Sequence, residues 1–187
     1  MKTIYLIRHG QTASNFEKRF QGHTDISLNK VGVNQAIKLA NYIEKMELDK
    51  IYSSDLSRAY DTACAIGKIK KIEVIKNKNL REGFFGDWEG ELVADILKKD
   101  PETYNKIFNN PENAMIKNGE SFSELQKRAW TEFQKIITIA KDDSNIAIVS
   151  HGATIRTILC SILGIRLKLK RIQIMKNRDA SQCLSRD

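Results

Sequence analysis

Four short runs of apolar, largely β-branched residues are distributed along the chain. They lie at residues 3–7, 50–52, 72–75 and 146–149. The apolar residues in these runs are continuous rather than alternating with polar ones, which is typical of strands buried on both faces of a parallel sheet. The pattern therefore predicts four short buried strands.

Between these strands, apolar residues recur every three or four positions, as on one face of a helix. The spacing is regular from Val33 to Ile43 and from Phe122 to Ala140. Capping residues add three shorter helices: residues 59–66, between an N-cap at Ser57 and a stop at Gly67, a segment that begins at Pro101, and residues 154–163, before Gly164. Strands and helices thus alternate along the chain.

This alternation predicts an α/β fold with three layers, α/β/α, around a mostly parallel central sheet. Residues 83–120 interrupt it with Gly, Asn and short helical pieces. We interpret this stretch as a small helical insertion that caps the rim formed by the carboxyl ends of the strands. The 187 residues have the length of one domain, so we expect a single domain over residues 1–187.

Composition narrows the class of protein and adds a hint about its partner. Hydrophobic residues make up 41% of the chain and charged residues 29%, as in globular rather than disordered proteins. The net charge of +8 suits an anionic partner. The lysines are scattered over amphipathic helices and the sequence contains no nucleic-acid-binding motif, so we do not expect a nucleic-acid partner.

Three further features indicate a cytoplasmic protein. Cys64, Cys160 and Cys183 are far apart and form no Cys-x-x-Cys pair, which is typical of a reducing compartment and disfavours structural zinc. No run approaches the roughly 18 apolar residues that a membrane-spanning helix needs. The first residues do not follow the pattern of a signal peptide. We therefore expect no association with a membrane.

Residues suited to binding phosphate follow three of the predicted strands. The first strand leads into Arg8 and His9, the second leads to Arg58 in the first turn of the next helix, and the fourth leads into His151. In open α/β sheets, ligands bind at the carboxyl ends of the strands. Each of these residues alone is more often structural or solvated, but together they predict a site with two histidines and two arginines.

Such a set is suited to phosphoryl transfer. A neutral imidazole can attack phosphorus and carry the phosphoryl group covalently. Two guanidiniums can hold the non-bridging oxygens, and a second histidine, if protonated, adds another donor. The leaving alkoxide needs a proton, for which Glu82 is the candidate, with a raised pKa if it is to hold that proton near pH 7. The sequence offers no obvious metal-binding cluster, and we expect no cofactor.

Four blocks of sequence contain these residues: Leu6–Thr12, Ser53–Ala59, Leu80–Glu82 with Gly86–Gly90, and Val149–Gly152. In this order they resemble the histidine phosphatase superfamily, also called phosphoglycerate mutase-like. The resemblance implies that His9 is the phosphorylated histidine and Glu82 the acid. It also implies that the phosphate is bound by Arg8, Asn15, Arg58, His151 and Gly152. The expected partner is a small phosphorylated metabolite.

Hydrolysis is favoured over isomerisation within this superfamily. In the phosphoglycerate mutases the acid is usually followed by Arg-His-Tyr-Gly, and an arginine pair in the insertion helps to hold the substrate carboxylate. Here Glu82 is followed by Gly83-Phe84-Phe85-Gly86, and residues 83–120 contain no arginine. A phosphoglycerate mutase and a phosphatase of broad specificity remain the alternatives.

The segment Phe84–Gly90, together with Asn118–Phe122, looks most like the α-ribazole phosphatases, which remove the 5′-phosphate of α-ribazole phosphate in late steps of cobalamin assembly. We hypothesise that one of the nearby aromatic rings stacks on the flat benzimidazole, the others packing the base of the insertion. The tentative substrate contacts are Thr12, Gln21, Gly22, Phe84, Phe85 and Trp88. We interpret His23, on the same loop as Gly22, as a surface residue.

Cys160 and Arg166 formally fit the Cys-x5-Arg loop of cysteine phosphatases. That loop must direct backbone N–H groups at phosphate, whereas the apolar spacing from Ile155 onward is helical, so we interpret Cys160 as a core residue. Residues 176–187 are polar where relatives often have a further apolar strand. We expect that end to be loose or differently placed, and both a monomer and a homodimer stay open.

Overall fold

The computed structural model describes residues 1–167 of the chain. Its elements, in chain order, are β1 (Thr3–Arg8), α1 (Ala13–Glu17), α2 (Lys30–Ile43), β2 (Lys50–Ser53), α3 (Ser57–Lys70), β3 (Val74–Lys76), the 3-10 helices η1 (Lys78–Leu80) and η2 (Gly86–Trp88), α4 (Val93–Lys99), α5 (Pro101–Asn109), the 3-10 helix η3 (Pro111–Asn113), α6 (Phe122–Ile139), β4 (Asn145–Ser150) and α7 (Gly152–Ile162). The expectation for residues 176–187 lies outside the described residues.

The four strands form one sheet in the order β1-β4-β2-β3, and each neighbouring pair is parallel. At the carboxyl end, Arg8 of β1 pairs with Ser150 of β4, and Ser53 of β2 pairs with Val149. The residues that follow β1, β2 and β4 therefore emerge side by side at one edge. This arrangement confirms the predicted α/β fold.

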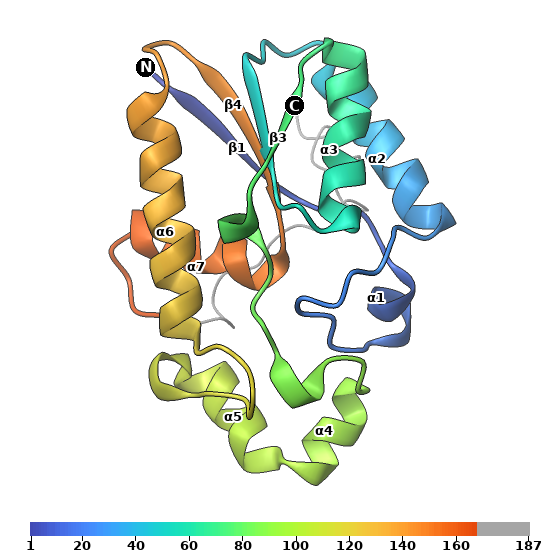
Figure 1. Ribbon diagram of the computed structural model, residues 1–187, viewed down its shortest axis with the longest axis vertical. Helices are drawn as coiled ribbons and strands as arrows, with labels where there is room; N and C mark the ends of the chain where they lie inside the picture. The colour runs from blue at the N-terminus through green and yellow to red at the C-terminus, as the bar shows by residue number, and fades with distance from the viewer. Residues whose placement is uncertain (168–187) are drawn as a thin grey trace, which may run out of the picture.

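Helices cover both faces of the sheet and produce the three layers. Figure 1 shows α2 and α3 on one side of the strands and α6 and α7 on the other. Ile51 and Val149 pack with α2 and α3 in one buried cluster, whereas Ile146 and Ile148 pack with α6 and α7 in another. The alternation of side chains along a strand explains why the same strand feeds both cores.

The limits of α3 differ from those predicted. The N-cap is Leu56 rather than Ser57, and Asp25 accepts hydrogen bonds from both the backbone N–H and the hydroxyl of Ser57 (2.7 and 2.8 Å). Gly67 does not stop the helix, because Lys71 takes the left-handed conformation instead. A Cβ at Gly67 would lie 2.7 Å from a backbone oxygen, so this glycine permits close packing at the turn into β3.

This turn also shifts β3, predicted at residues 72–75, to Val74–Lys76. The backbone N–H of Ile72 closes the turn on Gly67 rather than joining the sheet. At the other end of the chain, α7 begins at Gly152, two residues before its predicted start, and ends at Ile162. Both differences are local and leave the strand order unchanged.

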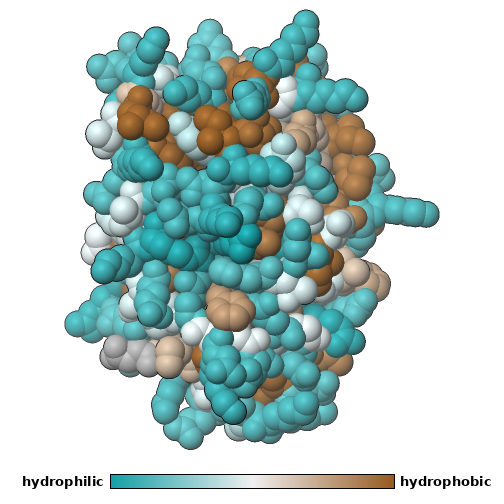
Figure 2. Space-filling view, in the orientation of Figure 1, coloured by the Kyte–Doolittle hydropathy of each residue, from teal (hydrophilic) through white to brown (hydrophobic). Residues whose placement is uncertain are grey.

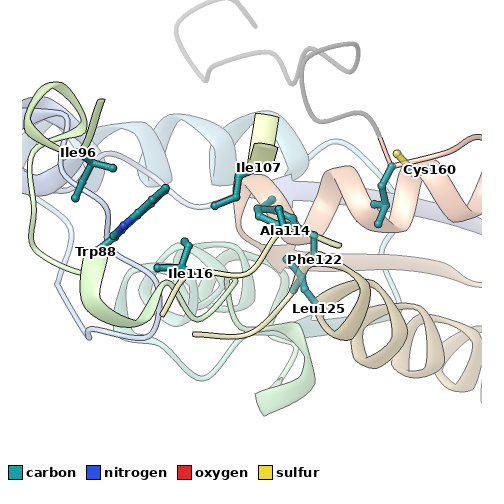
Figure 3. Packing of buried hydrophobic residues seen from close by; sticks show 10 residues of the cluster. Trp88, Ile96, Ile107, Ala114, Ile116, Phe122, Leu125 and Cys160 are labelled. Atoms are coloured by element: carbon teal, nitrogen blue, oxygen red, sulfur yellow. The ribbon is translucent and has the colours of Figure 1, made fainter. Parts of the chain in front are cut away.

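The insertion builds a third apolar cluster beyond the carboxyl ends of the strands. Figure 1 shows α4 and α5 there, with the lower end of α6 beside them. Trp88, Ile96, Ile107 and Ile116 of the insertion pack in one cluster with Phe122 of α6 (Figure 3). The side chains of the insertion therefore have a core that is distinct from the two against the sheet.

The surface in Figure 2 is mainly hydrophilic on the face shown, with apolar side chains gathered mostly toward the upper part of that view. Within residues 1–167, no helix has both the length and the apolar character that crossing a membrane requires.

Candidate active site

Two histidines and two arginines meet where β1, β4 and α3 come together. Arg8 ends β1, His9 follows it directly, His151 follows β4, and Arg58 lies in the first turn of α3. The imidazole centroids of His9 and His151 are 5.0 Å apart. His9 is 6% exposed, and Arg58 and His151 are fully buried. The structure thus brings these four residues together, and we call them the histidine pocket.

The ring of His9 is held in one tautomer. Its Nδ1 lies 2.7 Å from the carbonyl oxygen of Gly10, an acceptor, so Nδ1 must carry the hydrogen. The neutral ring then has its lone pair on Nε2. The backbone N–H of Gly10 donates to the hydroxyl of Thr62, which donates to the carbonyl of Arg58 (3.1 and 2.7 Å). This chain of contacts links the two sides of the pocket.

Both imidazoles of the histidine pocket are uncharged near neutral pH. Burial, followed by the positive charges of Arg58 and Arg8, lowers the pKa of His9 to about 3. Burial and the neighbouring His9 and Arg58 lower the pKa of His151 well below its usual value. A neutral His9 is the form that can act as a nucleophile. The protonated form of His151, which the sequence analysis considered as a donor to phosphate, is therefore disfavoured in the protein without bound phosphate.

Three buried nitrogens of this pocket have no hydrogen-bond partner among the described residues: Nε of Arg58 and both ring nitrogens of His151. Unpaired polar atoms are costly in a protein interior. Nη1 and Nη2 of Arg58, by contrast, donate to the carbonyls of Thr24 and Gly22 (2.9 and 2.7 Å). These contacts fix the guanidinium and leave the unpaired nitrogens suited to the oxygens of a bound phosphoryl group.

The loop that supports Arg58 requires a glycine at position 22. Gly22 has φ +57, and a Cβ there would lie 1.8 Å from Oε1 of Glu89. Gln21 is buried and accepts a hydrogen bond from the hydroxyl of Thr12 (2.7 Å). Gln21 and Gly22 therefore support the wall of the histidine pocket through these contacts.

Thr12 and Asn15 form a reciprocal cap at the start of α1. The backbone N–H of Asn15 donates to the Thr12 hydroxyl (3.1 Å), and the side-chain oxygen of Asn15 accepts from the backbone N–H of Thr12 (3.2 Å). The side-chain oxygens of both residues are thus used to fix the segment that follows His9.

Glu82 lies at the N-terminus of α7, next to Gly152. Its carboxylate accepts hydrogen bonds from the backbone N–H groups of Ala153 (3.1 and 3.2 Å) and Thr154 (3.2 Å). A carboxylate at this end of a helix is favoured by the helix dipole. The structure thus brings the predicted acid to the helix that carries the second histidine at its N-cap.

Two residues that sequence reasoning did not assign hold the backbone of Glu82. Nη2 of Arg128 and Nε2 of His23 both contact its carbonyl oxygen (2.7 and 2.9 Å). Arg128 also contacts the carbonyl of Arg81 and the carboxylate of Glu120. No local motif marks Arg128, because its partners are distant in sequence.

His23, interpreted from the sequence as a surface residue, is only partly exposed and makes specific contacts. Its side chain is half-buried, its ring lies beside Phe84 with centroids 5.2 Å apart, and its backbone N–H donates to Glu89 (2.7 Å). Burial and the charge of Arg128 lower the pKa of His23. Glu89 also accepts from the N–H of Thr24 (2.8 Å) and therefore joins the two loops.

A cavity of about 150 Å³ adjoins the histidine pocket, and we call it the chamber. Its lining includes residues from the end of β1, from the segment of Glu82 and from the start of α7: Arg8, Glu82, Gly152, Ala153 and Arg156. Apolar residues from other segments form the rest: Phe20, Phe85, Ile107, Phe108, Ile116 and Phe122. The chamber thus begins where Glu82 meets the histidine pocket.

Of the three aromatic residues predicted to contact substrate, the structure places Phe85 in the wall of the chamber. Trp88 is buried in the cluster of Figure 3, and Phe84 is 38% exposed beside His23. Phe20 and Phe122 line the chamber but were not predicted as substrate contacts; Phe20 lies outside the resembling blocks, and Phe122 was used only for the resemblance. Cys160 is buried inside α7, which confirms its interpretation as a core residue; the helix ends at Ile162, so the rest of the Cys-x5-Arg segment lies beyond it.

In residues 1–167, no group of three or more His, Cys, Asp or Glu residues gathers closely enough to hold a metal ion. The described site offers the imidazoles, the guanidiniums and one carboxylate. That set can supply a nucleophile, donors for phosphoryl oxygens and a group that transfers protons.

Comparisons with known proteins agree with this assignment of chemistry. The sequence model of the Histidine phosphatase superfamily (branch 1) matches residues 4–184. Phosphoglycerate mutase-like protein 4 of Arabidopsis thaliana is 37% identical over 83% of this chain and 68% of its own length. Phosphoserine phosphatase 1 of Hydrogenobacter thermophilus is 33% identical over 89% and 79%.

The fold is shared with solved structures of similar sequence. The alpha-ribazole phosphatase from Shigella flexneri superposes with a TM-score of 0.82 at 28% identity, over 93% of this chain and 86% of that one. The names of these relatives differ in substrate and in reaction, whereas the family match spans nearly the whole chain. The protein belongs to branch 1 of the histidine phosphatase superfamily and is a histidine-dependent enzyme of that superfamily.

Proposed function

We propose that the protein is a metal-independent phosphomonoester hydrolase that acts through a phosphohistidine on His9. The observation that carries this proposal is the contact between Nδ1 of His9 and the carbonyl of Gly10, which leaves the lone pair on Nε2 of a neutral ring. Arg8, Arg58 and His151 surround that ring with the donors that a phosphoryl group needs.

In the first step, Nε2 of His9 attacks phosphorus and the bond from phosphorus to the ester oxygen breaks. Glu82 must carry a proton for this step, and the negative charge of the bound phosphoryl group would favour that proton over the carboxylate that the N–H groups of α7 hold in the free protein. Glu82 gives the proton to the leaving alkoxide, and the alcohol departs through the chamber. In the second step, Glu82 takes a proton from a water molecule while the oxygen of that water attacks phosphorus. The P–N bond breaks, its electron pair returns to Nε2, and inorganic phosphate is released.

The other pocket residues would stabilise the transferring phosphoryl group. Arg8 and Arg58 offer guanidinium forks to the non-bridging oxygens, and His151 offers a ring nitrogen. The negative charge of a bound phosphoryl group would favour the proton that His151 lacks in the free protein. Asn15, through its side-chain NH2, and Gly152, through its position at the start of α7, would complete the phosphate site.

Hydrolysis is supported over isomerisation by the composition of the insertion. Residues 83–120 contain no arginine that could hold the carboxylate of phosphoglycerate there. We propose that this segment serves as the cap of the chamber, since Phe85, Ile107 and Ile116 supply part of its apolar wall. A phosphoglycerate mutase remains the alternative, because one similar protein is named phosphoglycerate mutase-like.

Two substrate chemistries fit the chamber. A flat, neutral group such as that of α-ribazole 5′-phosphate suits the rings of Phe20, Phe85 and Phe122, and one similar structure is an alpha-ribazole phosphatase. A short anionic group such as that of phosphoserine suits the arginines that also line the chamber, and one relative is a phosphoserine phosphatase. Both are small phosphorylated metabolites.

The proposal is tested by phosphate release in excess EDTA from α-ribazole 5′-phosphate, O-phosphoserine and 3-phosphoglycerate, beside the His9→Ala variant. We expect release from at least one substrate in the wild type and none above background in the variant. Acid-labile label on the wild-type protein after mixing with a ³²P substrate would identify the phosphohistidine. Isomerised 3-phosphoglycerate with little free phosphate would show a mutase, and unchanged release by His9→Ala would contradict the mechanism.

A further inference from the structure

The segment that carries Glu82 has no regular secondary structure. Residues 81–85 lie between η1 and η2, and Glu82 is followed by Gly83, the residue type with the greatest backbone freedom. Backbone groups that no helix or sheet pairs need other partners when they lie away from water. In this segment, side chains from distant elements supply those partners.

Arg128 of α6 binds three backbone carbonyls of this region. Its Nη1 donates to the carbonyls of Asn79 and Arg81 (2.9 Å each), and its Nη2 donates to the carbonyl of Glu82 (2.7 Å). A guanidinium is planar and its donors point in fixed directions, so it holds the three carbonyls in one arrangement. The next residue of α6, Ala129, is buried in the cluster against the sheet. Arg128 therefore ties the backbone of Glu82 to a packed helix.

Glu120 extends this contact to the other side of Gly83. Its carboxylate accepts from Nε of Arg128 and from the backbone N–H of Phe84 (2.9 Å each). The peptide group before Gly83 is thus held by Arg128 and the peptide group after it by Glu120. Both side chains are mostly buried, at 21% and 17% exposed, so solvent screens this ion pair little. The pair restricts the rotation that a glycine would otherwise permit.

The carbonyl of Glu82 has a second donor on a different loop. Nε2 of His23 lies 2.9 Å from the same oxygen, and because a carbonyl only accepts, Nε2 carries the hydrogen. The carboxylate of Glu82, by contrast, contacts the backbone N–H groups at the start of α7. The backbone and the carboxylate of this residue are therefore held by separate sets of donors.

We infer that Arg128 is a positioning residue for Glu82: by holding the Glu82 carbonyl, it sets the place from which the carboxyl group gives its proton to the leaving oxygen. Among the described residues, Arg128 is not part of the lining of the chamber, so it acts through Glu82 and not on the substrate. This inference rests on the proposed hydrolase function, in which Glu82 transfers the proton.

The dependence of the rate on the leaving group tests this role. Displacing a catalytic group by about 1 Å can cost about 10²-fold, and only a leaving group that needs a proton will show that cost. For Arg128→Gln, we expect the first chemical step to slow about 10- to 100-fold on the fastest of the alkyl phosphates α-ribazole 5′-phosphate, O-phosphoserine and 3-phosphoglycerate. The decrease should be less than about threefold on p-nitrophenyl phosphate. Pre-steady-state bursts measure both rates.

Two further variants of α6 sharpen the measurement. Arg128→Lys keeps the charge but lacks the planar fork, so its rate on the alkyl phosphate should lie between those of the wild type and Arg128→Gln. Lys127→Gln is the matched control, because it removes a positive charge from an exposed position next to Arg128. Its rates should equal those of the wild type on both substrates.

A double-mutant cycle shows whether Arg128 acts through Glu82. In a Glu82→Gln background, Arg128→Gln should cause no further loss on the alkyl phosphate, whereas full additivity would overturn the inference. Equal losses on alkyl and p-nitrophenyl phosphate would also overturn it. Burial is the main cause of the lowered pKa of His151 and the charge of Arg128 adds to it, so equal losses would indicate an effect on the histidine pocket.

His23→Phe tests the same carbonyl if circular dichroism shows that Arg128→Gln is unfolded. It removes the second donor to the Glu82 oxygen and keeps a ring beside Phe84. We expect a loss of about three- to tenfold on the alkyl phosphate and a smaller one on p-nitrophenyl phosphate. Equal losses on both substrates, or none on either, would overturn the inference in that case.

Failure of the inference is distinguishable from failure of the proposed function. If hydrolysis depends on His9 and Glu82→Gln shows the leaving-group dependence while the folded Arg128→Gln does not, the positioning role is wrong and the hydrolase stands. If His9→Ala retains the wild-type rate on p-nitrophenyl phosphate, the proposed mechanism itself is wrong.

Discussion

The histidine pocket and the chamber are neighbours, yet they are built from different kinds of structure. The pocket comes from strand ends and from the first turn of α3, and backbone carbonyls of Gly10, Gly22 and Thr24 fix its side chains. The apolar wall of the chamber includes side chains of the insertion packed against α6. Hydrogen bonds define geometry closely, whereas apolar contacts tolerate exchanges of similar volume.

This difference separates the reaction from the choice of substrate. A sheet edge that fixes four charged or titratable groups can retain the same chemistry while the insertion changes around it. The differing names of the similar proteins are consistent with this division. Substitutions in the histidine pocket should therefore affect every substrate, and substitutions in the chamber should change the ratio between substrates.

The largest effect is expected for the nucleophile. His9→Asn removes the attacking Nε2, so we expect a loss of about 10⁴-fold or more in kcat for every phosphomonoester, as for other covalent nucleophiles. His151→Asn should cost less, about 10²–10³-fold, because it removes one stabilising contact. Single-turnover kinetics and trapping of labelled protein would measure both. Equal losses, or labelled His9→Asn protein, would contradict the assignment of His9 as nucleophile.

The next effect concerns Glu82, where the pocket meets the chamber. Glu82→Gln removes proton transfer, and we expect a loss of about 10²–10⁴-fold for alkyl phosphates, whose alkoxides need a proton. The decrease in the rate of the first chemical step should be much smaller for p-nitrophenyl phosphate, since its leaving group is stable as an anion. Pre-steady-state bursts with both substrates would measure this step. The same loss for both would indicate that Glu82 has a structural role alone.

The sequence predicted the pocket better than its surroundings, for a physical reason. His9, Arg58 and His151 follow strands, and a parallel sheet brings strand ends together whatever the loops do. Arg128 and His23, which hold the carbonyl of Glu82, make contacts between segments far apart in the chain and leave no local pattern. The limits of α3 were missed because Asp25 and Lys71, outside the expected helix, set them.

The chamber was predicted in part for the same reason. An aromatic contact was expected from residues 84–88, but the choice among three rings depends on which of them the turn of η2 directs inward. Gly86 has φ +49, and a Cβ there would lie 2.2 Å from the carbonyl oxygen of Lys117, so a backbone segment distant in sequence fixes the turn. The spacing of residues along the sequence does not reveal such a close contact between two distant backbone segments.

A third, intermediate effect concerns stability at acid pH. An unfolded histidine has a pKa near 6.5, whereas burial lowers the pKa of His9 to about 3 and that of His151 in the same direction. The unfolded state therefore binds more protons between these values, so stability is complete above the unfolded pKa and is lost as the pH falls. We expect His9 alone to cost about 2 kcal/mol between pH 7 and pH 5.

Urea unfolding of the wild type and of His9→Asn at these two pH values would measure this effect. The variant should lose less free energy of unfolding between pH 7 and pH 5 than the wild type does. The slope with urea should stay the same, which would show that the extent of unfolding has not changed. Identical pH dependence in both proteins would mean that His9 is not the buried neutral group described above.

The smallest effect belongs to the apolar wall of the chamber and distinguishes it most directly from the pocket. Phe85→Leu keeps an apolar side chain of similar size but removes the ring, and we expect the kcat/KM ratio of α-ribazole 5′-phosphate to p-nitrophenyl phosphate to fall about two- to tenfold. Phe84→Leu is the matched control, since Phe84 lies beside His23 and outside the chamber wall. Its ratio should stay at the wild-type value.

The two leucine variants also separate the two substrate chemistries. If the arginines that line the chamber select an anionic substrate such as phosphoserine, the wild type will hydrolyse α-ribazole 5′-phosphate slowly, and the loss in Phe85→Leu will be measured against that low rate. If the rings select the substrate instead, the wild type will prefer α-ribazole 5′-phosphate to O-phosphoserine. A ratio that is unchanged in Phe85→Leu would show that the ring only fills space, and the chamber would then discriminate by charge.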